Sequence, residues 1–194
     1  WKTVARLGEL AYRCNLCRRC AQTCPIGVDN ALLAREIRKL FSQEMGIYAR
    51  ELHEKGTVNQ MKCGSSTGMT PEVVKENVEF IDEDYTEITG VGIHTPFDVQ
   101  GADIMLLHNA GEVMAWPENI AAFSLIFQEA GLSWTLSSKA LAYDGVNYGV
   151  FYDDAQTARI ALQHMMAAKE LGVKKIVIGE CGHAHKALTV IADR

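Results

Sequence analysis

Four cysteines within eleven residues constrain the fold of this chain more than any other feature of its sequence. Cys14, Cys17, Cys20 and Cys24 are separated by two, two and three residues, and Pro25 follows the last of them. This spacing lets thiolates from one tight loop reach several irons of the same cubane cluster. The motif therefore predicts that these four cysteines bind a [4Fe–4S] cluster and that the protein transfers electrons.

Two other uses of clustered cysteines agree less well with this spacing. Structural zinc sites take their ligands from separated C-x2-C pairs rather than from three cysteines in one run. Disulfide frameworks are typical of secreted chains, and residues 1–13 lack the apolar run of a signal peptide. The motif thus favours iron in a reducing compartment, and we expect a cytoplasmic protein.

The fourth cysteine of the motif leaves the ligand count open. In two-cluster ferredoxins the equivalent of Cys24 binds the neighbouring cluster, but this sequence holds only one such motif. A second motif upstream of Trp1 would supply the missing ligands, and the absence of an initial methionine agrees with a longer protein. Alternatively, a single cluster takes Cys24 or Cys63 as its fourth ligand. We expect a second cluster in the intact protein.

Cys63 lies in a glycine- and hydroxyl-rich segment, KCGSSTGM, at residues 62–69. A loop of this composition can direct backbone amides at an anion such as a cluster sulfide, which makes Cys63 a candidate metal ligand. The alternative is a flexible linker that happens to contain a cysteine, and this composition is more typical of a linker.

Cys181 lies in the segment GECGHAH, directly after an expected strand at residues 175–179. The carboxyl ends of parallel strands are where α/β proteins place their sites. Cys181, followed by His183 and His185, is therefore a candidate metal ligand or reactive, catalytic thiol. The alternative is a small buried thiol beside histidines of the following helix.

The N-terminal segment, residues 1–62, has a helical pattern. We expect one helix at residues 3–13 and another capped by Asp29 or Asn30. The apolar face of the second helix is expected from four residues at helical spacing, Leu33, Ile37, Leu40 and Phe41. A short helix at residues 47–54 is expected to end at Gly56.

A polar stretch at residues 56–70 reads as a linker or long loop. After it, Thr70 and Pro71 form the start signal of a helix that continues through the acidic residues 72–87. Residues 63–90 are therefore predicted to be a linker followed by an acidic helix.

Strands and helices alternate in the remainder, residues 91–194. Strands are expected at residues 103–108, 133–137 and 175–179, and helices at 117–130, 153–171 and from 183 onward. Such alternation predicts parallel strands joined by right-handed crossovers, with helices on both faces of the sheet. The fold class is accordingly α+β: a helical ferredoxin-like module followed by an α/β module with a parallel sheet.

Charge is distributed unevenly along the chain. Residues 1–62 carry eleven Lys or Arg against six Asp or Glu, whereas residues 63–194 carry eight against eighteen. This asymmetry predicts two regions with different contact surfaces. The basic residues are not interleaved with aromatic ones, so nucleic acid is not expected as a partner. No apolar run approaches the roughly 20 residues of a transmembrane helix.

With these residues identified, the chain resembles the iron–sulfur subunits of the heterodisulfide reductase D-type family. That family includes the iron–sulfur subunits of glycolate oxidase and of the tetrahaem cytochrome c complex. Residues 14–28 (CNLCRRCAQTCPIGV) resemble the second of two ferredoxin motifs in these proteins. The α/β part resembles the cysteine-rich CCG region that follows, on four stretches: residues 102–116, 134–138, 143–154 and 178–185.

The CCG pattern has a cysteine after its first strand, then a cysteine pair, and a closing C-x2-C. This sequence has Asn109 near the first position and Tyr143, Asp144 and Gly145 near the pair, so that Cys181 alone matches a CCG cysteine. By resemblance we expect a CCG-like domain that contributes Cys181 at its closing position.

The resemblance implies an electron-transfer subunit at the cytoplasmic face of a membrane redox complex. Its partners would be a membrane cytochrome b or cytochrome c subunit and other redox subunits. Electrons would pass between a haem or quinone partner and a soluble or thiol/disulfide couple. Two alternatives stay open: a catalytic subunit that reduces a disulfide or oxidises a hydroxyacid, and a scaffold whose cluster only stabilises the fold.

Overall fold

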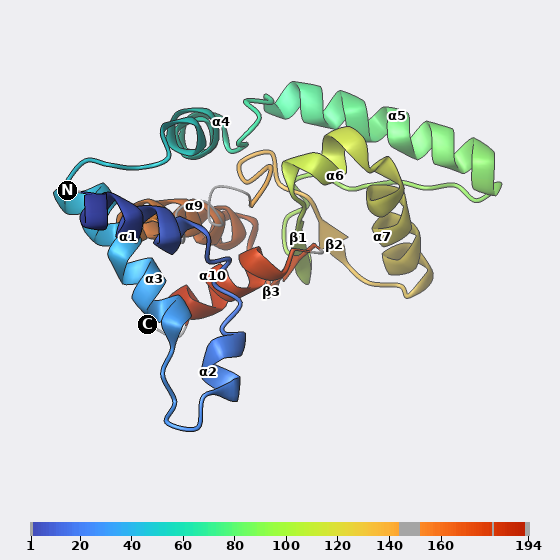
Figure 1. Ribbon diagram of the computed structural model, residues 1–194. Helices are drawn as coiled ribbons and strands as arrows, with labels where there is room; N and C mark the ends of the chain where they lie inside the picture. Colours follow the sequence, from blue (N-terminus) through green and yellow to red (C-terminus); the bar gives the residue numbers. More distant parts are fainter. Residues whose placement is uncertain (1, 144–151, 180, 193–194) are drawn as a thin grey trace.

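A three-stranded parallel sheet organises the C-terminal half of the chain (Figure 1). The computed structural model describes residues 2–143, 152–179 and 181–192. The strands are β1 (Ile104–Leu107), β2 (Trp134–Thr135) and β3 (Lys175–Ile178), in the order β2-β1-β3. Ile104 is paired with Trp134 on one side and with Lys175 on the other. The mixed helical and parallel-sheet class predicted from the sequence is confirmed.

Helices cover both faces of this sheet. Met105 and Leu107 of β1 pack against α9 (Asp154–Leu171) and α10 (Gly182–Ala192). Leu106, which points the opposite way, packs in a core with residues of α5 (Pro71–Thr89), α6 (Ala110–Ala115) and α7 (Pro117–Glu129). Alternation along a strand sends successive side chains to opposite faces, and this produces the predicted three layers.

The middle strand of the prediction, residues 133–137, is shorter than expected. β2 ends at Thr135 because the next residue pairs elsewhere: Leu136 N–H donates to Pro96 O at 2.8 Å, and Asp98 N–H donates to Leu136 O at 2.9 Å. Helix α6 was not expected from the sequence. The first and third strands and the flanking helices lie where they were predicted, within a residue or two of the expected ends.

The N-terminal region contains α1 (Lys2–Tyr12), α2 (Arg19–Thr23), α3 (Asn30–Lys39) and the π-helix η1 (Leu40–Glu44). The side chain of Asp29 accepts hydrogen bonds from the backbone N–H groups of Ala31 and Leu32, so the predicted cap of α3 is confirmed.

The apolar face predicted for α3 is wrong in part. Leu33 and Leu40 are 57% and 52% exposed, while the buried residues are Ala31, Ala34, Arg38 and Phe41. Small alanines let α1 approach α3 closely. A methyl group at Gly8 of α1 would lie only 2.9 Å from the ring of Phe41, so Gly8 also contributes to this close packing.

The prediction of a linker from Gly56 is wrong for residues 56–63, which are helical. The π-helix η2 (Leu52–Thr57) runs through Gly56 into α4 (Val58–Cys63). Its polar side chains are buried: the Gln60 amide donates to Ala142 O at 2.7 Å, and the Thr57 hydroxyl lies 2.8 Å from Tyr152 OH. Hydrogen bonds to distant residues therefore keep this segment helical, although its composition is typical of a loop.

The start signal at Thr70 is confirmed, because its side chain caps α5 and Pro71 occupies the first turn. The helix ends at Gly90, which adopts a left-handed conformation. The division of the chain into three segments, 1–62, 63–90 and 91–194, stays a prediction.

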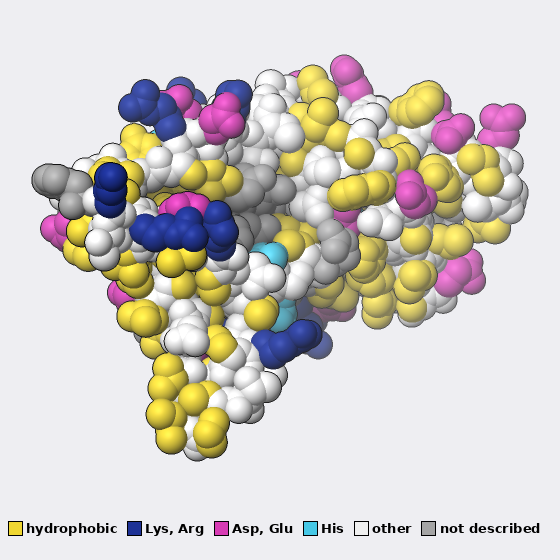
Figure 2. All heavy atoms as spheres, in the orientation of Figure 1, with side chains coloured by type: hydrophobic (Ala, Val, Ile, Leu, Met, Phe, Trp, Pro, Cys, Tyr) yellow, Lys and Arg dark blue, Asp and Glu magenta, His cyan; other side chains and the backbone are white. Residues whose placement is uncertain are grey.

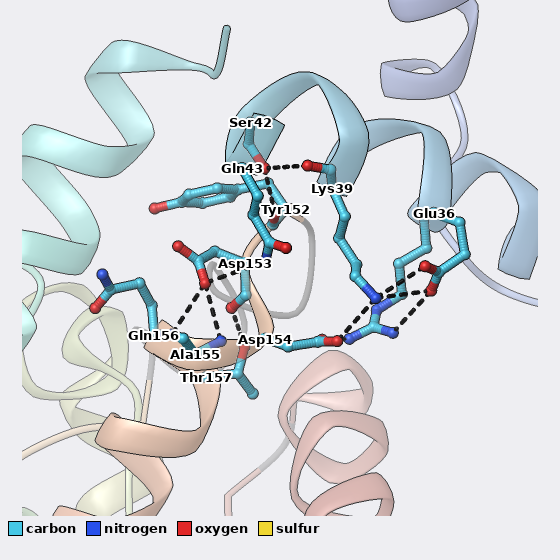
Figure 3. A network of polar contacts seen from close by, with 11 residues as sticks. Glu36, Lys39, Ser42, Gln43, Tyr152, Asp153, Asp154, Ala155, Gln156 and Thr157 are labelled. Atoms are coloured by element: carbon cyan, nitrogen blue, oxygen red, sulfur yellow. Dashed lines mark hydrogen bonds and ion pairs between the residues drawn. The ribbon is translucent and has the colours of Figure 1, made fainter. Parts of the chain in front are cut away.

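The N-terminal region is attached to the start of α9 by a polar network (Figure 3). Asp154 accepts ion pairs from Arg35 and from Lys39, the latter at 2.9 Å. Ser42 Oγ donates to the backbone O of Tyr152 at 2.5 Å. Asp153 caps α9 through the backbone N–H groups of the next turn. Three consecutive residues thus connect α3 and η1 to the α/β region.

The surface keeps the charge asymmetry of the sequence. In Figure 2, the charged side chains over α5 and α7 are Asp and Glu, whereas the Lys and Arg side chains in view lie over α1 and α4 and beside α2, with some acidic side chains among them. Across the residues that the structure describes, no helix combines the length and the apolar character needed to cross a bilayer.

Candidate metal centre

The cysteine loop begins where α1 ends and turns sharply between its cysteines. Leu16 and Arg18 have φ of 58° and 59°, a left-handed conformation that non-glycine residues rarely adopt. Leu16 is buried, and its backbone N–H donates to Cys14 Sγ at 3.4 Å. Strained residues persist where their surroundings fix them, and they concentrate at functional sites. The loop is therefore held in the shape that brings an amide to the first thiol.

A short helix, α2, occupies the middle of the motif and carries Cys20. The backbone N–H of Cys24 donates to Cys20 O at 3.1 Å, so the last two cysteines are one helical turn apart. This helix was missed in the sequence, although the spacing of Cys20 and Cys24 is itself helical.

The four thiols differ in their surroundings. Cys14 and Cys20 pack against the cysteine-loop core, which consists of the buried residues Ala11, Leu16, Ala31 and Ala34. Cys17 is exposed. Cys24 lies in a turn beyond α2, where the backbone N–H groups of Val28, Ile26 and Gly27 lower the pKa of its thiol. Two thiols, those of Cys14 and Cys20, thus pack against the core of the loop, whereas the Cys24 thiol lies at the outer turn and is stabilised there as a thiolate.

The residues present fit an iron–sulfur cluster in their donor chemistry. Thiolates are the ligands such clusters require, and hydrogen bonds from amides to sulfur are among the features that set cluster potentials. Within the described ranges, no three His, Cys, Asp or Glu side chains lie close enough together to hold a metal ion. The assignment of these cysteines as cluster ligands therefore depends on their spacing in the sequence and on the chemistry of their thiolates.

The amides around Cys24 predict an unusually reactive thiol in the metal-free protein. Since its pKa is lowered, a larger share of Cys24 is thiolate near neutral pH, and the thiolate is the nucleophile. We expect iodoacetamide to modify Cys24 several times faster than a free cysteine at pH 7, with the advantage disappearing above pH 9. Peptide mass spectrometry of the metal-free protein measures this, and a rate equal to that of free cysteine would contradict it.

Cys63 ends α4, apart from the cysteine loop. Its sulfur lies 3.0 Å from the carbonyl O of Asn59 and 3.5 Å from that of Ser65, as expected for a thiol that donates to backbone oxygens. In Figure 1, α4 and α2 lie on opposite sides of the α1–α3 pair. The role of Cys63 as a ligand stays a prediction.

Cys181 lies between β3 and α10, at the carboxyl edge of the sheet. It borders an open pocket of about 400 Å³, whose other lining residues are Ile176, Ile178, Gly179, Gly182 and His185. His183, two residues further on, has Nε2 at 3.2 Å from the backbone O of Asn15, inside the cysteine loop. The structure therefore brings the start of α10 into contact with the cysteine loop. Glu180 lies outside the described residues, as do Asp144 and Gly145.

A buried polar cluster lies at the same edge of the sheet, on residues that sequence reasoning did not single out as a site. Asn109 and Glu112 form a reciprocal capping box at the start of α6, each side chain 2.7 Å from the other's backbone N–H. His108 Nδ1 is 3.4 Å from Glu112 Oε1, and both side chains are buried. The spacing Asn-x-x-Glu is a recognisable signal for such a cap.

Tyr143 joins this cluster to Cys181. Its hydroxyl accepts hydrogen bonds from Asn109 Nδ2 at 3.4 Å and from the backbone N–H of Cys181 at 3.3 Å. Burial raises the pKa of Tyr143, and the phenol therefore stays protonated at neutral pH. These contacts fix the backbone of Cys181 against the sheet.

Comparison with known proteins gives two related chains. The chain is 28% identical over 177 residues to the Hdr-like menaquinol oxidoreductase iron–sulfur subunit 2 of Archaeoglobus fulgidus, covering 89% of this chain and 32% of that protein. It is 29% identical over 177 residues to the Hdr-like menaquinol oxidoreductase iron–sulfur subunit of Archaeoglobus profundus, with coverage of 88% and 31%.

The chain thus spans about a third of the length of the curated relatives it matches. No protein-family model matches the sequence, and no solved structure matches it. The resemblance predicted from the sequence is confirmed by the two relatives: this chain is similar, over most of its length, to iron–sulfur subunits of Hdr-like complexes.

Proposed function

We propose that this chain is an iron–sulfur electron-transfer subunit of a membrane-associated redox complex. The observation that carries the proposal is the cysteine loop, where a C-x2-C-x2-C-x3-C-P motif is held in a strained shape with a backbone amide on Cys14. The names of the two relatives, both iron–sulfur subunits of a menaquinol oxidoreductase, support the same function.

Cys14, Cys17 and Cys20 hold a [4Fe–4S] cluster in this proposal, and the cluster supplies one-electron chemistry when bound. Cys24 serves a second, neighbouring cluster in the intact protein. Two features support this separate role: Cys24 lies at the outer turn rather than on the cysteine-loop core, and its thiolate is stabilised by its own set of amides.

The complex is proposed to lie at the inner face of the cell membrane, with this chain on its cytoplasmic side. Electrons pass between a quinone or haem partner, such as a cytochrome b or cytochrome c subunit, and a soluble or thiol/disulfide couple. Exposed apolar side chains flank the outer turn of the cysteine loop: Ile26 is 81% exposed and Val28 is 45% exposed. A redox partner that covers this turn would exclude water from the cysteines.

Iron and acid-labile sulfide, measured after anaerobic purification, test the cluster. We expect both in the purified protein, a reduced-state EPR signal, and magnetic interaction between two clusters in the full-length protein. Tetrahedral zinc without sulfide would falsify the proposal, and a single non-interacting cluster in the full-length protein would remove Cys24 from its separate role. A cluster that no physiological reductant reduces would favour the scaffold alternative.

Cys181 extends the proposal to thiol redox chemistry. Its thiol borders the 400 Å³ pocket, and α10 contacts the cysteine loop through His183. The same experiment is repeated on Cys181→Ser, which is expected to keep the EPR signal and the iron content while lowering turnover with the physiological partner. Full turnover in that variant would make Cys181 a packing residue.

A further inference from the structure

One buried cation packs beside the cysteine loop, and no motif pointed to it. Arg38 of α3 is 2% exposed. Its Nε and Nη2 donate to the backbone O of Ala11 at 3.0 and 2.8 Å, and Nη2 also donates to the backbone O of Cys14. Its guanidinium carbon lies 5.0 Å from the centre of the Tyr12 ring. Arg38 therefore joins α3, the end of α1 and the first cysteine.

Arg38 stays charged at this position. Burial lowers the pKa of its guanidinium, but the neighbouring Cys14 thiol and Tyr12 phenol act in the opposite direction when ionised. An arginine side chain does not lose its proton in a protein at neutral pH. Removing such a charge from water is unfavourable unless its donors are satisfied, and the carbonyl oxygens of Ala11 and Cys14 satisfy several of them.

One reason for burying Arg38 is structural, because its contacts stabilise the end of α1. The carbonyl groups at the end of a helix lack partners within it and carry partial negative charge, so a cation there stabilises the helix. Arg38 does this for α1 and at the same time fixes the carbonyl that follows the first thiol of the motif. Arg38 therefore has a structural role, and its buried charge has an electrostatic effect in addition.

A charge in a poorly screened environment also acts on neighbouring redox groups. Coulomb interactions between buried charges are several times stronger than those at the surface. The potential of an iron–sulfur cluster depends on net charge, hydrogen bonding and exposure around its ligands. A positive charge beside the Cys14 ligand favours the cluster state that holds one more electron.

We infer that Arg38 is a positioning residue that raises the reduction potential of the cluster bound through Cys14. This inference rests on the proposed electron-transfer function. The step concerned is a one-electron reduction: the electron comes from a quinol-class donor in the complex, or from dithionite in the titration, and no bond is formed or broken. The positive charge of Arg38 lowers the free energy of the reduced cluster. The N–H groups of its guanidinium hold the backbone of Cys14 in place.

The test is a redox titration of the purified holoprotein, followed by EPR. Arg38→Gln is expected to retain iron and sulfide but to shift the midpoint potential to more negative values. Arg38→Lys keeps the charge and is expected to shift the midpoint by less than half as much. Arg13→Gln is the matched control, because it removes the same charge from the residue directly before Cys14. The Arg13 side chain is 64% exposed and paired with Glu9, so solvent and salt screen its charge.

Iron and sulfide analysis separates this inference from the proposed function, since a wild-type protein without a cluster would refute the function itself. An Arg38→Gln protein with full cluster content and an unchanged midpoint would overturn the inference. An equal shift in Arg13→Gln would also overturn it, because the effect would then be net charge and not the buried position. Loss of the cluster in both Arg38 variants would assign Arg38 a purely structural role.

Discussion

Replacing Cys20 by alanine is expected to remove most of the iron and sulfide of the cluster bound through Cys14, because losing only an outer partner of a metal ligand already costs about 10- to 100-fold in metal affinity. Cys20 lies on α2 and packs with Cys14 against the cysteine-loop core. Removing its thiol takes one of three proposed ligands from that cluster. Colorimetric iron and sulfide assays measure the result, and circular dichroism checks that the helices persist.

Cys63→Ala is the matched control for this experiment. It also removes one thiol, but that thiol lies apart from the cysteine loop and donates to the carbonyl groups of Asn59 and Ser65 at the end of α4. The control variant is expected to keep its iron. Equal loss of iron from both variants would instead make Cys63 a ligand, which is the alternative that the sequence left open.

Gly179→Ala is expected to lower the free energy of unfolding by about 1–3 kcal/mol, the usual cost of overpacking a buried site. A methyl group at this glycine would lie 2.8 and 2.9 Å from the two carboxylate oxygens of Glu112. That carboxylate has little freedom to move, since it is buried and bonded to the backbone N–H of Asn109 at 2.7 Å. Thermal and denaturant unfolding measure the loss.

Gly182→Ala provides the comparison three residues further along. No atom lies within 4 Å of the position that its methyl group would occupy, and Gly182 starts a helix, where alanine is favoured over glycine. We expect this variant to be as stable as the wild type or slightly more stable. A Gly179→Ala protein of undiminished stability would mean that the buried polar cluster at the sheet edge tolerates displacement.

The features that the sequence predicted correctly depend on neighbouring residues along the chain. The caps formed by Asp29 and Thr70 need only the side chain and the amides of the next turn. The strand at β1 is an uninterrupted apolar run that ends at a histidine. The cysteine motif is likewise a local signal, and the ligands that its spacing predicts stay a prediction.

Long-range packing decided the features that were predicted wrongly. Gly56 has the composition signal of a helix end, yet the helix continues because Thr57 and Gln60 find partners more than 80 residues away. Leu33 of α3 and Leu40 of η1 have the right period for a buried face. They are exposed because alanines and Gly8 set the distance between α1 and α3, and period does not reveal that distance.

The candidate site shows the same contrast. Its cysteines are predicted from spacing, whereas Arg38 lies 24 residues from the cysteine whose carbonyl it binds, and Tyr143 lies 34 residues from Asn109. An arginine on a helix has no local pattern that distinguishes a buried position from a solvated one. Only the folded arrangement reveals that this cation belongs to the cysteine loop.

The attachment of α9 at both ends has a mechanical consequence. Asp154 ties the first turn of the helix to α3, and Leu171 packs at the other end against the core beneath β1. A helix of 18 residues spans about 27 Å and resists compression along its axis. It therefore holds α3, which packs against α1 beside the cysteine loop, at a fixed distance from the sheet.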